Sequence, residues 1–61
     1  MNGEEIRALR LRLGMTQFEF AQAVGAQVST VSTWENNHVR ISSMAERAVR
    51  ALAAEQGEAG G

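Results

Sequence analysis

Gly25 restricts the possible folds of this chain more than any other residue. It lies between two short stretches whose apolar residues have helical spacing. Phe20 and Val24 precede Gly25, and Val31 and Trp34 follow it after a connection of about three residues. Glycine takes up the left-handed backbone conformation without a Cβ penalty, and so short a connection holds two helices near a right angle. The pattern therefore predicts two crossed helices whose large apolar side chains pack on the rest of the chain.

Glycines and capping residues divide the whole chain into four predicted helices. These cover about residues 3–13, 16–25, 27–36 and 43–54. Thr16 followed by Glu19, and Ser43 followed by Glu46, have the spacing of capping boxes, which begin helices. Gly14 is expected to end the first helix in a left-handed conformation.

The apolar positions of these helices predict one common core. The expected inward residues are Ile6, Leu9, Leu13, Phe20, Ala21, Val24, Val31, Trp34, Met44, Ala48, Val49 and Leu52. We expect an all-α fold, a compact four-helix bundle or a five-helix bundle that lacks its last helix. One domain is expected over residues 1–55, with a flexible C-terminal tail over residues 56–61.

Composition argues against several classes of protein. Cysteine and aspartate are absent and histidine occurs once, so we expect no disulfide, metal, cofactor or catalytic arrangement, and no enzyme. No apolar run reaches the roughly 18 residues that a membrane helix needs, and the acidic start does not look like a signal peptide. The sequence therefore predicts a cytoplasmic protein.

The charge of the chain is balanced, with a net value of −1. Taken alone, this value argues against nucleic-acid binding, because such domains are usually basic. Four of the seven glutamates, however, lie near the two ends of the chain, and all six basic residues are arginine. Arginine suits phosphate because its planar guanidinium can form two parallel hydrogen bonds.

The segment from Gln17 to Asn36, with the sequence QFEFAQAVGAQVSTVSTWEN, resembles the helix-turn-helix of the phage repressor and Cro (Xre-like) family. Ala21 stands where the two helices approach closely, and Gly25 stands at the turn. The resemblance extends over about residues 4–52. It implies a repressor-like bundle, a bacterial or phage source, and binding to double-stranded DNA by the second helix of the motif in the major groove.

The resemblance also implies roles for individual residues. Base contacts are expected from Gln27, Val28, Ser29, Ser32 and Thr33. Phosphate contacts are expected from Thr16, Gln17, Asn36 and Arg40. Structural roles are expected for Arg10, Glu35, Ala21, Gly25, Val31 and Trp34, with Arg10 and Glu35 forming an ion pair.

Two residues depart from the family pattern. Gln27 is a poor helix cap, and Val28 offers a base only apolar contact, such as with a thymine methyl group. The loop over residues 37–41 has fewer basic residues than is usual in the family, which predicts weak binding per monomer.

Three functions therefore stay open. The leading one is a transcriptional regulator that acts as a homodimer, with its dimer surface on the fourth helix and the C-terminal segment, around Met44, Val49 or Leu52. The second is an antitoxin-like module that binds a toxin protein, for which an exposed Phe18 would be a sign of a partner surface. The third is the DNA-binding part of a larger regulator, with residues 57–61 as its linker.

Overall fold

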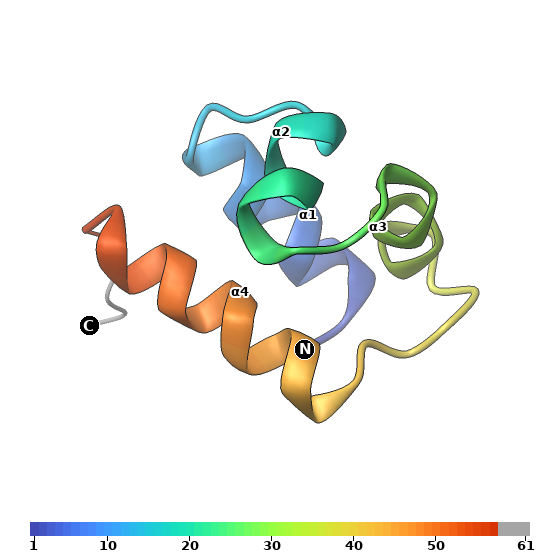
Figure 1. Ribbon diagram of the computed structural model, residues 1–61. Helices are drawn as coiled ribbons and strands as arrows, with labels where there is room; N and C mark the ends of the chain where they lie inside the picture. Colours follow the sequence, from blue (N-terminus) through green and yellow to red (C-terminus); the bar gives the residue numbers. More distant parts are fainter. Residues whose placement is uncertain (58–61) are drawn as a thin grey trace.

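A computed structural model describes residues 1–57 of the 61-residue chain. This part contains four α-helices and no strand (Figure 1). The helices are α1 (Gly3–Arg12), α2 (Gln17–Val24), α3 (Val28–Glu35) and α4 (Ser43–Glu55). The predicted all-α fold is confirmed, with helix ends within about one or two residues of those expected. Most of the predicted tail, residues 58–61, lies outside the described residues.

Polar side chains begin three of the helices. Asn2 starts α1 and Thr16 starts α2, each in a capping box with the glutamate three residues later. The prediction that Ser43 caps the last helix is wrong. Ser42 has the extended backbone of a cap, and its hydroxyl accepts a hydrogen bond from the Ala45 N–H at 3.2 Å. Glu46 does not complete a capping box; its carboxylate accepts from the Met1 amino group at 2.9 Å.

A left-handed residue follows every one of the four helices, including Gly57 with φ 81° after α4. Three of these ends share one pattern of hydrogen bonds, at Gly14, Gly25 and Asn37, with φ of 71°, 78° and 60°. At each, the amides of this residue and of the next one bond back to carbonyls three and five residues earlier. These paired bonds are the Schellman motif, which satisfies carbonyls that a helix end leaves without partners.

All four helices and the loop before α4 contribute to one apolar core. Its buried members are Ile6, Leu9, Phe20, Ala21, Val31, Trp34, Ile41, Val49, Leu52 and Ala53. α3 packs against both α2 and α1, and α2 also contacts α4. Ile41 is not among the expected core residues, because it lies in a loop where no helical periodicity marks its inward position.

The inward face of α4 differs from the expected one at its beginning. Met44 is 81% exposed, whereas Val49, Leu52 and Ala53 are buried. Residue 44 lies five positions before Val49, which places it about 140° around the helix. Val49 and Leu52 are part of the chain's own core, so of the three residues expected around a dimer surface only Met44 is on the outside.

Within residues 1–57, no helix is both long enough and apolar enough to cross a bilayer.

Candidate nucleic-acid interface

The connection between α2 and α3 sets the direction of α3. Gly25 has φ 78° and ψ 28°, and the Ala26 N–H bonds back to the Ala21 carbonyl at 2.8 Å. A Cβ built on Gly25 would meet no atom within 4 Å. The requirement for glycine is therefore one of backbone conformation rather than of space. This turn joins α2 and α3, which pack on each other as the two crossed helices of Figure 1.

The two sides of α3 differ in chemistry. Val31 and Trp34 are 0% and 6% exposed and face the core. Gln27 and Ser29 are exposed, and Val28 is 44% exposed, at the start of the helix. Ser32 and Thr33 are half-buried further along it. All five residues expected to contact bases are thus at least partly accessible.

The polar groups of α3 are not equally available to a partner. The Thr33 hydroxyl donates to the Thr30 carbonyl at 2.7 Å, so its proton is used within the helix while its oxygen can still accept. Gln27 occupies the cap position of α3, but its side chain makes no capping hydrogen bond. Its amide therefore projects from the start of α3 with both donor and acceptor groups.

A buried ion pair anchors α3 to α1. Arg10 Nε lies 2.7 Å from Glu35 Oε2, and a second guanidinium nitrogen lies 3.2 Å from Oε1. The third nitrogen donates to the Met15 carbonyl at 2.9 Å, so one arginine ties together α1, the loop after it and α3. The two side chains are only 11% and 5% exposed.

The same carboxylate also binds a residue of α2. Gln17 Nε2 donates to Glu35 Oε1 at 3.2 Å. Burial on its own raises the pKa of Glu35, but the hydrogen bonds from Arg10 and Gln17 and the charge of Arg10 outweigh it and hold the pKa below its ordinary value. The sequence gives no sign of this bond. One amide proton of Gln17 is committed to Glu35, and a second remains for a phosphate oxygen.

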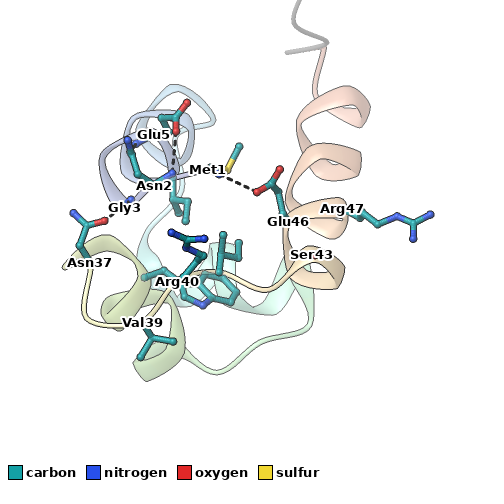
Figure 2. A pocket seen from close by; sticks show the side chains of 13 residues that line it. Met1, Asn2, Gly3, Glu5, Asn37, Val39, Arg40, Ser43, Glu46 and Arg47 are labelled. Atoms are coloured by element: carbon teal, nitrogen blue, oxygen red, sulfur yellow. Dashed lines mark hydrogen bonds and ion pairs between the residues drawn. The ribbon is translucent and has the colours of Figure 1, made fainter.

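The other expected phosphate contacts lie at the start of α2 and in the loop after α3. Thr16 uses its hydroxyl oxygen to cap α2, accepting from the Glu19 N–H at 3.1 Å. Asn36 and Arg40 are exposed in the loop after α3. An open groove of about 800 Å³ lies between this loop and the first turns of α1 and α4. Figure 2 shows Arg40 over this groove, whereas the guanidinium of Arg47, which also lines it, extends away.

The electrostatics of this surface are unusual for a DNA-binding face. No lysine or arginine occurs between Arg12 and Arg40, whereas Glu19 and Glu35 lie in this interval. Of these two, Glu35 forms an ion pair with Arg10, which balances its negative charge. Arg40 is therefore the cation that the chain supplies next to α3 on its C-terminal side.

The fold and the outward polar side of α3 define a DNA-binding helix-turn-helix domain. Residues 6–53, most of the chain, match the sequence pattern of the family described as Helix-turn-helix. The chain belongs to this family of the phage repressor and Cro type, whose domains bind double-stranded DNA and act in regulation rather than in catalysis.

One relative carries a regulatory name. The chain is 42% identical over 55 residues to the Propionyl-CoA carboxylase regulator of Cereibacter sphaeroides. The match covers 90% of this chain and 11% of that protein, so the chain spans about a ninth of its relative's length. No solved structure matches the chain significantly.

Proposed function

We propose that this protein is a sequence-specific transcriptional regulator that inserts α3 into the major groove of DNA. The observation that carries the proposal is the division of α3, with Val31 and Trp34 in the core and Val28, Ser29 and Ser32 on the accessible side. Hydroxyl groups bond to base edges or phosphates, and a valine can contact a thymine methyl group. An α-helix fits the width of the major groove.

We also propose that the protein binds DNA as a homodimer. α3 has eight residues and reaches only about four or five base pairs, too few to single out one site in a genome. Two copies on half-sites about one helical turn apart solve this problem. We therefore expect the preferred DNA to contain two related half-sites, and the complex to contain two chains.

The direct test is selection of bound duplexes from a randomised pool, followed by a binding measurement with one matched pair of variants. Ser29→Glu places a negative charge at the second position of α3, where the helix dipole favours it, so the fold is kept. Repulsion from DNA phosphates should weaken binding more than about a hundredfold. Ala51→Glu adds the same charge on the exposed side of α4 and should leave affinity within a few fold.

Two results would overturn the proposal. The first is a pool from which no sequence is enriched even at low salt. The second is equal DNA affinity of the Ser29→Glu and Ala51→Glu proteins, because DNA would then bind somewhere other than α3.

A protein partner is the second candidate function. Among the described residues, Leu11, Phe18, Val39 and Met44 are more than half exposed, and exposed apolar residues are common at protein interfaces. An antitoxin-like module would use them to bind a toxin protein. In that case Ser29→Glu would leave partner binding intact, whereas Phe18→Ser would weaken it.

The relative's length supports the third possibility, a DNA-binding part of a larger regulator. The chain corresponds to about a ninth of that regulator, so further parts of such a protein would supply oligomerisation or ligand sensing. This possibility shares the α3 interface with the leading proposal and is tested by the same selection.

A further inference from the structure

The end of α3 is tied to the first turn of α1 by a contact far apart in the sequence. The Gly3 N–H donates to Asn37 Oδ1 at 2.9 Å, across 34 positions of the chain (Figure 2). Gly3 is buried, and a Cβ on it would lie 2.6 Å from the Glu35 carbonyl oxygen, with the Trp34 carbonyl at least as close. Only glycine lets α1 approach the last turn of α3 so closely.

Asn37 occupies a position whose backbone conformation glycine adopts with less strain. Its φ is 60°, and its backbone N–H closes α3 onto the Trp34 carbonyl at 3.1 Å. Glycine adopts this left-handed conformation with less steric strain than asparagine. The side chain of Asn37 therefore has a use that offsets the backbone strain, and the bond to Gly3 is the contact that it makes.

The two residues lie beside the loop that is expected to meet the DNA backbone. Asn36 immediately precedes Asn37, and Arg40 follows three positions later. Figure 2 shows Gly3, Asn37 and Arg40 around the same groove. A loop fixed at one end by this bond presents its phosphate-binding groups in one arrangement, which lowers the entropy lost on binding.

We propose that Gly3 and Asn37 form a clamp that positions the Asn36–Arg40 loop for contact with DNA phosphates, so that Asn37 is a positioning residue of the interface. The inference rests on the proposed DNA-binding function, but the clamp itself is a property of the free chain. It is distinct from the ion pair of Arg10 with Glu35, which holds the last turn of α1 to the last residue of α3.

The test uses Asn37→Gly, which keeps the left-handed turn and removes the side-chain oxygen that accepts the hydrogen bond from the Gly3 N–H. The relieved backbone strain offsets part of the lost hydrogen bond, so the melting temperature should fall only modestly. In the free protein, heteronuclear relaxation should show residues 36–40 becoming more mobile. On the selected duplex, Kd should rise about three- to tenfold, and the salt dependence should become shallower.

A double-mutant cycle with Arg40→Ala separates positioning from general stability. If the clamp positions Arg40, then Arg40→Ala should weaken binding less in the Asn37→Gly background than in the natural sequence. Gly3→Ala should loosen the same loop, but it should also lower the melting temperature, because its Cβ would meet the Trp34 and Glu35 carbonyls and force α1 away from α3. Should Gly3→Ala fail to fold, the double-mutant cycle of Asn37→Gly with Arg40→Ala still tests whether the clamp positions Arg40.

The outcomes distinguish a failure of the clamp from a failure of the proposed function. If the natural chain binds no duplex, the proposed function fails, and unchanged mobility of residues 36–40 in Asn37→Gly overturns the clamp independently. If the natural chain binds and Asn37→Gly leaves Kd within twofold, with an unchanged Arg40→Ala effect, the positioning role is overturned while the proposed function stands.

Discussion

Gly25 is the residue on which the arrangement of α2 and α3 depends. Its φ of 78° lies in a region that side chains branched at Cβ rarely adopt. Because a Cβ at this position would have no atom within 4 Å, a substitution there acts through the backbone and not through a clash. The Ala26 amide that bonds back to Ala21 requires the same local conformation.

Gly25→Val should therefore destabilise the fold by about 1–3 kcal/mol. Gly25→Asn is the matched control, since asparagine tolerates the left-handed region, and it should be less destabilising. Thermal unfolding followed by circular dichroism measures both. Equal melting temperatures for the valine and asparagine proteins would mean that the turn does not need its positive φ.

At the scale of the helices, local patterns in the sequence predict more than distant contacts. The capping box of Thr16, the glycine stops and the 3.6-residue periodicity all lie within one or two turns of the chain, and each predicts a helix or its end. Ser42 and Ser43 both suit the cap position of α4, so the sequence does not distinguish them. Met44 is exposed because the burial of Val49 and Leu52 sets which side of α4 faces the core.

Contacts between helices leave weaker traces in the sequence. The bonds from Gln17 to Glu35 and from Gly3 to Asn37 span 18 and 34 positions. No periodicity connects such positions, and each residue taken alone is an ordinary polar or small one. The ion pair of Arg10 with Glu35 is expected only through the resemblance to the phage repressors, not from the residues themselves.

The Glu35 network gives the assembly of α1, α2 and α3 a dependence on pH. The pKa of Glu35 is lowered in the folded chain, so its contribution to stability is present above the ordinary glutamate range and is lost as the pH falls through the folded value. Glu35→Gln removes this contribution and leaves Arg10 without a counter-charge. At neutral pH the variant should be less stable by up to about 3–5 kcal/mol.

The difference between Glu35→Gln and the natural chain should shrink on acidification, because Glu35 becomes protonated in the latter. Chemical denaturation at a series of pH values follows this difference. Glu46→Gln is the control: hydrogen bonds from the Met1 amino group and Arg50 lower the pKa of Glu46 too, but on the surface, so its effect should be small. A constant difference between Glu35→Gln and the natural chain at all pH values contradicts the network.

For the molecule as a whole, the distribution of charge determines how much electrostatic attraction contributes to DNA affinity. A net charge of −1 and the absence of lysine and arginine between Arg12 and Arg40 leave few cations to replace the counterions of DNA. In the proposed complex, affinity must then come from hydrogen bonds, shape and the pairing of two copies. This fits a surface of hydroxyl and amide groups better than one that binds by charge.

The salt dependence of binding should accordingly be shallow. Each phosphate contact by a cation contributes a slope of about −0.9 to a plot of log K against log salt concentration, and Arg40 is the expected contact of this kind. We predict a slope of about −1 per bound chain, most of which Arg40→Ala abolishes. Binding titrations over a range of KCl concentrations measure it. A steep slope that Arg40→Ala leaves unchanged would show that other arginines meet the DNA.

We expect the accessible side of α3 to lie against DNA bases, and amide NMR spectra recorded during titration with the selected duplex report this contact residue by residue. We predict that the largest shift changes fall on residues 27–36, with smaller ones at Gln17 and Arg40 and almost none along the second half of α4. Large changes confined to α4 or to the surface around Leu11 and Phe18, with α3 unaffected, would contradict it.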